Sequence, residues 1–329
     1  MVDVSLFGPR GKFEDVAEAV QCAEALGFDG CLFGEHHGTP QNEFPQLLTL
    51  IAALAPMTTR IRLGTSILLL PLYDPIHVAE QAAMIDRISG GRLILGVGIG
   101  YQENDFTHFG IPMRQRVSRF EEGLEVIRRA WTEDEVTFSG QRYRYQGVRV
   151  FPRPVQDPHP PIWMAAWSDA GARRAGRSGD AFVTDPIQNL AATRHFVDEY
   201  RGVAERRGRQ PRVVLMRELL CAPTRAEAEE RYGPGLLATY RYYWRNGAFN
   251  EELEPWVRDI TSPDQITLDT VVSDRVIIGS AEDCAGQIEH WLNETGAEHV
   301  QLTIPGRVET QIADVTFTGK ELVPKLKAM

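Results

Sequence analysis

Short apolar runs and amphipathic stretches alternate along the chain, and each pattern predicts its own kind of element. The apolar runs have the length of buried strands: Val2–Phe7, Gly30–Gly34, Arg62–Leu70 and Leu93–Val97. Between them, apolar residues recur every three or four positions, which is the spacing of a helix with one buried face. These helical stretches are Glu14–Leu26, Phe44–Ala55, Ile76–Ile88 and Arg114–Trp131. Successive strand–helix units predict a parallel sheet with right-handed crossovers.

The alternation is interrupted and then resumes. Residues 136–150 are rich in aromatic and β-branched side chains around Ser139-Gly140, which predicts an inserted hairpin, and the proline-rich residues 152–161 predict an irregular connector. Further strands are predicted at Pro161–Ala165, Ala181–Thr184, Arg212–Cys221 and His299–Ile304. Further helices are predicted from Ala170 and over Leu190–Arg207 and Ala281–Asn293. The strand–helix units total eight, so we expect a TIM (β/α)8 barrel.

Residues 224–275 break the pattern a second time. They are polar and aromatic, with helical spacing at Arg225–Tyr232 and Leu236–Tyr243 and no clear strand. We interpret them as an insertion after strand seven, the largest in the barrel, that forms a lid over the bound cofactor; a fixed structural excursion is the alternative. Nothing marks a second domain, so we expect residues 1–329 to form a single barrel domain that carries the hairpin and the insertion.

Composition and charge narrow the class of protein. Of the 329 residues, 43% are hydrophobic, which is enough for a substantial core, and the formal net charge is -10. Phosphate backbones and anionic lipids repel an acidic chain, so we expect no nucleic-acid or membrane partner. The opening residues lack a basic region followed by an apolar run, and we expect no leader peptide and a cytoplasmic location. The four cysteines lack metal-ligand spacing and are expected to be free thiols, most of them buried.

The most informative feature is Gly34-Glu35-His36-His37, at the end of the second apolar run. In a TIM barrel the active site lies at the carboxyl ends of the strands, so two imidazoles and a carboxylate stand where the chemistry takes place. His36 and His37 are therefore candidate catalytic residues, and ordinary core or loop histidines are the alternative. A shared metal ion is disfavoured, because adjacent residues on a strand point to opposite sides. We expect no metal.

Two further strand ends suit binding. Gly98 and Gly100 end the fourth strand, where missing side chains let a flat ring lie against the backbone; close packing alone would also call for glycine. After the fifth strand, the turn Ala166–Gly171 opens a helix, and the N–H groups and dipole of a helix start bind anions. Ser168 or Asp169 also suits a helix cap there, and the two roles are compatible.

At these positions the chain resembles the bacterial-luciferase-like flavin-dependent oxidoreductases and monooxygenases, which are TIM barrels. The matching motifs are Leu26-Gly27-Phe28, Gly34-Glu35-His36-His37, Arg62-Leu63-Gly64-Thr65, Leu69-Leu70-Pro71, Asp86-Arg87-Ile88-Ser89-Gly90-Gly91-Arg92, Gly96-Val97-Gly98-Ile99-Gly100-Tyr101, Phe106-Thr107-His108-Phe109-Gly110 and Pro160-Pro161-Ile162-Trp163. In this order and at these spacings they are specific for the superfamily, and they do not specify a substrate.

The resemblance implies roles for particular residues. His36 corresponds to the strand-two histidine that lies near the flavin ring and handles protons when reduced flavin reacts with oxygen. A non-proline cis peptide is implied at Ser66–Ile67, under the ring. The flavin phosphate is implied at Trp167-Ser168 and at the start of the helix that begins with Ala170-Gly171.

Two departures from the family pattern bear on the cofactor. Luciferase carries an arginine after strand four that reaches the phosphate, and this chain has Ile99 there, so the phosphate charge must be met elsewhere. The candidates are Arg173, Arg174 and Arg217. Relatives that use the 5-deazaflavin coenzyme often carry a glutamate near the position of Tyr101. Its absence, with both histidines retained, favours FMN over deazaflavin.

These implications converge on an FMN-dependent monooxygenase of the two-component kind. A separate flavin reductase would supply the reduced FMN, since nothing in the chain resembles a nicotinamide site, and O2 would be used on a small organic substrate. The alternatives are a deazaflavin-dependent hydride-transfer oxidoreductase and a non-catalytic flavin-binding protein. The segment Tyr240–Trp244 and the loop Thr39–Phe44 are expected to wall the substrate side.

We also expect a homodimer, partly from the resemblance. The helices Phe44–Met57 and Ile76–Ile88 carry more apolar residues than packing against a barrel requires, and surplus apolar surface marks an interface.

Overall fold

The computed structural model describes residues 2–38, 44–245, 247, 249 and 251–329; residues 39–43 of the expected substrate-side loop lie outside this range. The chain forms two compact units, and each is described by itself. The first comprises the segment up to Pro9, Glu18–Asp29 and Ala165–Met329, and the second comprises Arg10–Ala17 and Gly30–Met164. Eight times along the described chain a parallel strand is followed by a helix, and the fold is the TIM barrel that the sequence predicts.

The second unit contains four parallel strands in the order β2, β3, β5 and β8. Their bounds are Gly30–Phe33, Arg62–Thr65, Leu93–Gly98 and Ile162–Ala165. The helices are α2 (Leu47–Leu54), α3 (Pro75–Ser89), α4 (Glu103–His108) and α5 (Arg116–Thr132). Strands β2 and β5 are buried along their whole length because both faces of a parallel sheet are covered.

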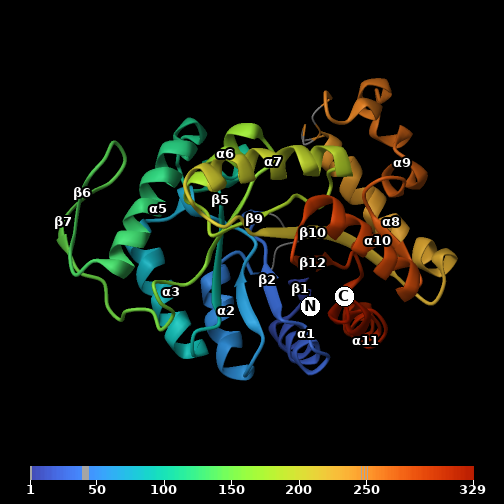
Figure 1. Ribbon diagram of the computed structural model, residues 1–329, viewed down its shortest axis with the longest axis horizontal. Helices are drawn as coiled ribbons and strands as arrows, with labels where there is room; N and C mark the ends of the chain where they lie inside the picture. Colours follow the sequence, from blue (N-terminus) through green and yellow to red (C-terminus); the bar gives the residue numbers. More distant parts are fainter. Residues whose placement is uncertain (1, 39–43, 246, 248, 250) are drawn as a thin grey trace. The chain divides into compact units, whose positions relative to one another are not determined.

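The predicted strand Arg62–Leu70 is interrupted. The peptide bond Ser66–Ile67 is cis, as the resemblance implied, and it separates β3 from the short strand β4 (Leu68–Leu69), which pairs with β5. An antiparallel hairpin of β6 (Val136–Ser139) and β7 (Arg144–Val148) lies within the stretch predicted for it and contacts α5 (Figure 1).

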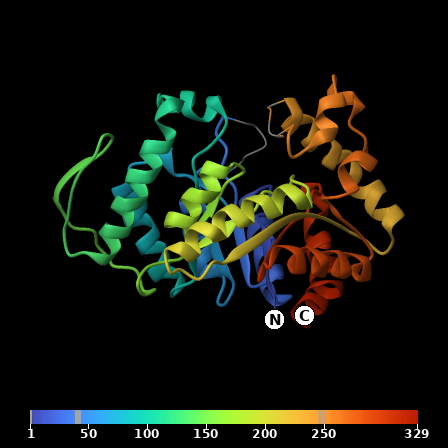
Figure 2. The ribbon, with the colours of Figure 1, turned by 45° about the horizontal axis from the view of Figure 1, so that its top comes forward.

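The first unit contains four parallel strands in the order β9, β10, β12 and β1. Their bounds are Ala181–Val183, Val213–Cys221, His299–Thr303 and Asp3–Phe7, and β11 (Ile277–Gly279) pairs with the end of β10. The helices include α6 (Asp169–Ser178), α7 (Leu190–Arg206), α10 (Ala281–Thr295), α11 (Gln311–Glu321) and α12 (Val323–Lys327), and α1 (Phe13–Ala25) follows β1. Near the two ends of the chain, β1 and α12 lie side by side (Figures 1 and 2).

Some predictions about elements were wrong. The two short helices predicted at Arg225–Tyr232 and Leu236–Tyr243 form one helix, α8 (Arg225–Arg245), with Pro234 inside it. The lost backbone hydrogen bond is offset because Tyr232, Leu236 and Tyr240 lie four residues apart and bury one continuous face. The sequence pattern missed α4, β11, α11 and α12, which are short or only weakly periodic.

The insertion has a core of its own. Buried residues of α8 pack against the end of β10 and against α9 (Leu268–Val272), and Figure 2 shows α8 and α9 as a projecting group of the first unit. A buried ion pair anchors the segment, with Arg275 Nη2 2.9 Å from Glu254 Oε2. Glu254 accepts a hydrogen bond from the Asn189 backbone, and Arg275 donates to the Ile187 carbonyl. These contacts favour a fixed excursion over a mobile lid.

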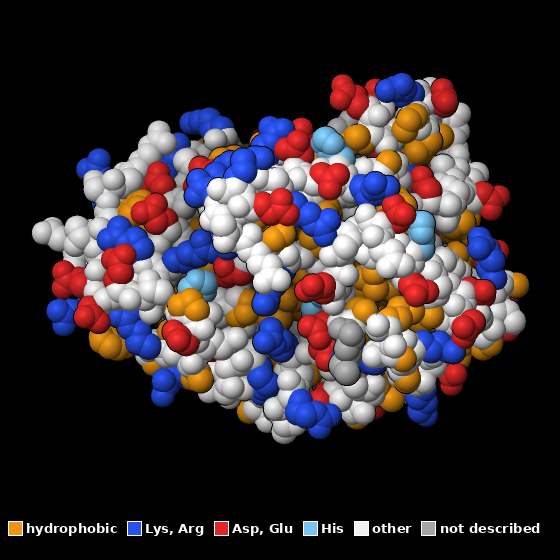
Figure 3. All heavy atoms as spheres, viewed as in Figure 1, with side chains coloured by type: hydrophobic (Ala, Val, Ile, Leu, Met, Phe, Trp, Pro, Cys, Tyr) orange, Lys and Arg blue, Asp and Glu red, His pale blue; other side chains and the backbone are white. Residues whose placement is uncertain are grey.

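Side chains of both charges are interspersed over the face seen in Figure 3.

Burial in the structure tests two further predictions, on the apolar residues of α2 and on the cysteines. The apolar residues of α2 that were expected to be surplus are all buried: Leu47, Leu48, Leu50, Ile51 and Leu54. They pack internally, so that part of the argument for an interface was wrong. The four cysteines are unpaired as predicted, and three of them are buried.

Candidate functional site

The Glu35 carboxylate, at the end of β2 in the second unit, is the centre of a buried network. It is 3% exposed and accepts hydrogen bonds from His37, from the Leu69 backbone and from Tyr73. The distances are 2.5 Å to His37 Nε2 and 2.6 Å to the Leu69 nitrogen. Burial and the adjacent carboxylate raise the pKa of Tyr73, so its hydroxyl remains a donor. The network ties the end of β2 to β4 and to the turn that follows it.

His36 and His37 are neighbours with different surroundings. His37 is buried against the Phe109 ring, at 4.6 Å between ring centroids, and bonds Glu35. The side chain of His36 is 39% exposed, and its Nδ1 lies 3.4 Å from a carboxylate oxygen of Asp105. The two imidazoles therefore do not share one environment: His36 can reach a reactant, whereas the position of His37 fits a structural role.

Asp105 is the functional residue that sequence reasoning missed. It lies on α4, is buried, and accepts the His37 backbone N–H at 2.9 Å as well as facing His36. Burial alone would raise the pKa of Asp105, but the hydrogen bonds from His36 and the His37 backbone outweigh it and lower that pKa. A charged carboxylate therefore holds His36 at neutral pH. The available signal was an acidic residue directly before the Phe106 motif.

The strand-end glycines make room for close packing. A Cβ on Gly98 would lie 1.8 Å from the side chain of Ile67, which occupies the adjacent space. Gly100 has a left-handed backbone, with φ of 73°, and a Cβ there would lie 2.9 Å from the Phe106 ring. Ser66 is buried. Packing thus accounts for both glycines without a ligand, and the cofactor roles of Ser66, Ile67, Gly98 and Gly100 stay predictions.

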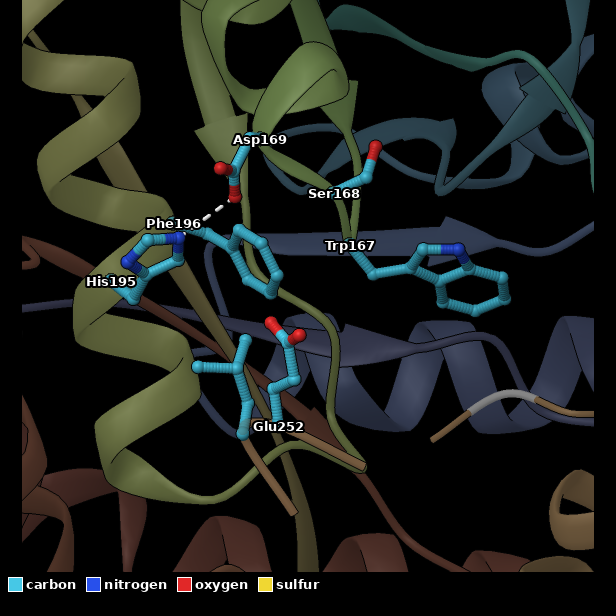
Figure 4. A pocket seen from close by; sticks show the side chains of 7 residues that line it. Trp167, Ser168, Asp169, His195, Phe196 and Glu252 are labelled. Atoms are coloured by element: carbon cyan, nitrogen blue, oxygen red, sulfur yellow. Dashed lines mark hydrogen bonds and ion pairs between the residues drawn. The ribbon is translucent and has the colours of Figure 1, made fainter. Parts of the chain in front are cut away.

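The turn before α6, in the first unit, borders a pocket of about 340 Å³. Ser168 caps the helix by accepting the Gly171 N–H at 3.3 Å. A Cβ on Gly171 would lie 2.5 Å from that of Ala166, so the tight turn requires glycine here. In Figure 4 the Trp167 ring extends away from the cap, and Phe196 and Glu252 line the opposite side.

The charges around this pocket are of both signs. Asp169 lines it, and its carboxylate lies 2.7 Å from His195 Nε2 and 3.6 Å from Arg173 (Figure 4 shows the His195 contact). Glu252 adds a second carboxylate. The first N–H groups of α6 have no acceptor within the helix, so they can serve an anion. Arg173 offsets the charge of Asp169, which favours an anion at this helix start.

The three candidate arginines are not equivalent. Arg217 is fully buried, and its terminal nitrogens donate to the carbonyls of Asp185, Pro186 and Gln188 and to a threonine hydroxyl. It stacks on Trp291, 4.0 Å from the ring centroid. These bonds commit it to the loop after β9, which argues against a phosphate role. Arg173 pairs with Glu199 and Asp169, and Arg174 is buried.

Two further findings concern the described residues alone. Among residues 2–38, 44–245, 247, 249 and 251–329, no group of three or more His, Cys, Asp or Glu side chains is placed to hold a metal ion. In the same part of the chain, no helix has the length and apolar character needed to cross a membrane.

A parallel barrel hosts many unrelated activities, so the fold alone does not give the class of enzyme, and comparison with known sequences identifies it. The sequence profile of the luciferase-like monooxygenase family matches residues 4–299. The chain belongs to this family.

Curated relatives differ in coverage. The uncharacterized protein y4vJ of Sinorhizobium fredii is 33% identical over 199 residues, which are 59% of this chain and 57% of that protein. The chain thus matches little more than half the length of that relative. An F420-dependent glucose-6-phosphate dehydrogenase of Amycolatopsis mediterranei is 26% identical, over 98% of this chain and 96% of that protein.

Solved structures share the whole fold. The monooxygenase RslO1 of Streptomyces bottropensis is 25% identical, with a TM-score of 0.79 over 98% of this chain and 99% of that one. The oxygenating constituent of 3,6-diketocamphane monooxygenase of Pseudomonas putida, solved with FMN, is 19% identical, with a TM-score of 0.81 over 99% of both chains. At that identity the second likeness shows the fold alone.

Replacing Glu35 by glutamine tests the buried network. The amide has one acceptor oxygen instead of two, so at least one of its three donors loses its partner, and we expect a loss of about 1–3 kcal/mol in the free energy of unfolding. Urea denaturation measures it. Glu103→Gln, an exposed carboxylate at the start of α4, is the control and should change stability by less than about 0.5 kcal/mol. Equal stability of Glu35→Gln and wild type would contradict the proposed network.

Proposed function

We propose that this protein is an FMN-dependent monooxygenase that uses reduced FMN and O2 on a small organic substrate. A separate flavin reductase would supply the reduced cofactor. The observation that carries the proposal is the partly exposed His36 held by the buried Asp105. Family membership supports it, because the family is named for monooxygenases.

His36 and Asp105 suit the handling of a proton. Nδ1 of His36 faces the carboxylate, so Nε2 is the ring atom that points away from Asp105 and through which a proton would pass to or from a reactant. The lowered pKa of Asp105 means that this carboxylate keeps its negative charge beside the His36 ring. When bound, reduced FMN would supply the electrons for oxygen activation. The residues of the chain would bind, orient and protonate.

The cofactor phosphate would be held at the start of α6. The turn of Ser168 and Gly171 opens the helix at the pocket, and Arg173 offsets the nearby carboxylate of Asp169. These residues fit a phosphate group.

A deazaflavin-dependent hydride-transfer oxidoreductase is the second candidate. It is favoured by the full-length relative named as an F420-dependent glucose-6-phosphate dehydrogenase. Tyr101, which lies edge-on to His36 at 6.0 Å between ring centroids, stands near the place where such enzymes often carry a glutamate. Because this chain has a tyrosine and not a glutamate at that place, we prefer FMN over the deazaflavin coenzyme as its cofactor. A non-catalytic flavin-binding protein would need neither the exposed histidine nor its buried carboxylate.

The first test concerns the phosphate. We expect FMN to bind at least about tenfold more tightly than riboflavin, because helix N–H groups recognise only the phosphorylated form. Gly171→Ala should weaken FMN binding and leave riboflavin binding unchanged, since the added Cβ would clash with Ala166 and crowd the Ser168 hydroxyl. Fluorescence titration measures both, with F420 as a third ligand. Gly286→Ala is the control, because nothing lies within 4 Å of a Cβ there. Equal affinity for FMN and riboflavin would remove the phosphate assignment, and tight F420 binding alone would favour the second candidate.

The second test concerns His36. His36→Ala should lower substrate-dependent oxygen uptake by about 10²–10⁴-fold, as loss of a positioned acid–base group does, with FMN affinity and melting temperature unchanged. A panel of aldehydes and ketones with photoreduced FMN provides the assay. His77→Ala, an exposed histidine on α3, is the control and should retain wild-type rates. If His36→Ala is as active as wild type, His36 has no part in the mechanism.

We also propose a homodimer, on the remaining apolar surface. Met84 and Ile88 of α3 are each 50% exposed, and Val155 in the same unit is 52% exposed. Light scattering at micromolar concentration should show a dimer for wild type and a monomer for Ile88→Lys, because a buried lysine would disrupt the interface. Val308→Lys, an exposed apolar residue in the first unit, is the control. A monomeric wild type would exclude the dimer.

A further inference from the structure

Two of the four cysteines lie together where the chain enters and leaves the insertion. Cys221 is the last residue of β10, just before the insertion, and Cys284 is in the first turn of α10, which follows β11. Cys221 is paired in register with Gly279, and the Cys284 Sγ lies 3.6 Å from the carbonyl oxygen of that same glycine. A hydrogen bond joins the Cys284 thiol to the Cys221 sulfur, so the two sulfur atoms are neighbours.

The backbone around the pair is fixed on both sides. The Ala222 N–H donates to the Gly279 carbonyl at 3.1 Å, which joins the end of β10 to β11. Gly279 has a φ of 139°, and a Cβ there would lie 2.8 Å from the Asp283 side chain, so the turn into α10 requires glycine. Ser280 and Asp283 then form a capping box at the start of the helix. Hydrogen bonds on each side of Gly279 thus set the positions of the two thiols.

The two sulfur atoms differ in their protonation. The hydrogen bond from Cys284 lowers the pKa of Cys221, and it outweighs burial and the carboxylates of Glu321 and Asp283, which raise that pKa. The same bond, together with burial, raises the pKa of Cys284, which therefore stays a thiol. The thiolate is the form of cysteine that attacks an oxidant, so Cys221 is the more reactive of the two. Burial alone raises the pKa of Cys31, which makes that thiol the inert contrast.

We propose that Cys221 and Cys284 form a disulfide when the protein meets hydrogen peroxide, and that a dithiol reductant reverses it. The Cys221 sulfur attacks one peroxide oxygen and the O–O bond breaks. The other oxygen takes up the thiol proton and leaves as water, so Cys221 becomes a sulfenic acid. The Cys284 sulfur then displaces the hydroxyl group, which leaves as a second water with the Cys284 proton. Two thiols are oxidised to one disulfide, and one peroxide is reduced to two waters.

Burial restricts the oxidant that can act on the pair. Cys221 and Cys284 are 2% and 0% exposed, so a small oxidant reaches them during local opening, whereas a bulky thiol has no room to form a mixed disulfide. Reduced flavin that reacts with oxygen in the absence of a substrate releases hydrogen peroxide, so the proposed function would supply the oxidant. The inference itself depends on the two side chains alone, and no cofactor is needed to test it.

The disulfide would join the two ends of the insertion. It closes a loop that contains residues 222–283, and two residues of this loop, Glu252 and Leu253, line the pocket beside α6. Closing a long loop restricts the unfolded chain more than the folded one, so the oxidised protein should be the more stable form. The bond would therefore hold the insertion against the barrel strand under oxidising conditions.

Peptide mapping tests the proposal on the full, folded chain. The protein is treated with hydrogen peroxide, its remaining thiols are blocked with N-ethylmaleimide, and it is then denatured and digested with trypsin. We expect a cross-link between residues 218–225, which contain Cys221, and residues 276–307, which contain Cys284. Dithiothreitol should remove it. The melting temperature should rise by about 5 °C on oxidation and return on reduction.

Single variants establish the order of the two steps. In Cys284→Ser, peroxide should leave a sulfenic acid on Cys221 that dimedone traps, because the thiol that would displace it is gone. In Cys221→Ser, Cys284 should remain unlabelled. Both variants should lose the cross-link and the rise in melting temperature. Cys22→Ser is the matched control, because this partly exposed cysteine lies on α1, apart from the pair, and the variant should keep both effects.

Several results would overturn the proposal. These are a folded wild type that keeps all four thiols after peroxide, a cross-link that forms only after urea has unfolded the protein, and a cross-link to residues 13–60, which contain Cys22 and Cys31, in place of the expected one. Equal dimedone labelling of Cys284 in Cys221→Ser would remove Cys221 as the sulfur that is attacked. None of these results depends on FMN, so failure of the proposed function would leave them unchanged.

Discussion

The second unit is organised around one carboxylate. Glu35 follows a wholly buried strand, and in that position an uncompensated charge would destabilise the fold. It is compensated because His37, the Leu69 backbone and Tyr73 all donate to it. His37 belongs to the same segment as Glu35, whereas Leu69 and Tyr73 come from β4 and the turn that follows it. The bonds fix the backbone on both sides of His36, whose own side chain remains partly exposed. The reactive group can be accessible because its two neighbours in the chain are held fast.

The elements that bury a continuous apolar strip were predictable from sequence. Strands such as Gly30–Phe33 and Val213–Cys221 are buried throughout, and their composition reflects it. The site was predicted only in part. His36 and His37 were found because they follow the end of a strand, whereas Asp105, the carboxylate that contacts His36, lies on a helix and was missed. Asp105 lies on a helix of six residues, too short for a periodic pattern to form. The apolar residues of α2 were wrongly assigned to an interface. A sequence pattern shows how many apolar residues a helix has, but it does not show which other parts of the same chain cover them.

Arginine 217 shows why charge alone is a poor guide to phosphate binding. Its position on a barrel strand made it a candidate for a cofactor contact, yet the side chain turns to the loop after β9 and stacks on Trp291. Arg275 is used similarly, with carbonyl and carboxylate partners around the insertion. The planar guanidinium can satisfy several buried acceptors at once, which makes it a structural residue here. A helix start, with its own N–H groups, can then bind an anion without an arginine.

The buried pair of Glu254 and Arg275 has a consequence for anyone who reshapes this enzyme. The insertion that covers the end of β10 packs around a core of its own, which makes it a segment to exchange as a block between relatives. A transplanted segment that carries the carboxylate into a host without the arginine, or the reverse, would leave one charge buried and alone, at a cost of about 3–5 kcal/mol. The graft must therefore span both residues and keep the loop at Ile187 and Asn189 that receives them. The limits of the segment to be exchanged are therefore set by the buried ion pair and not by the ends of the helices.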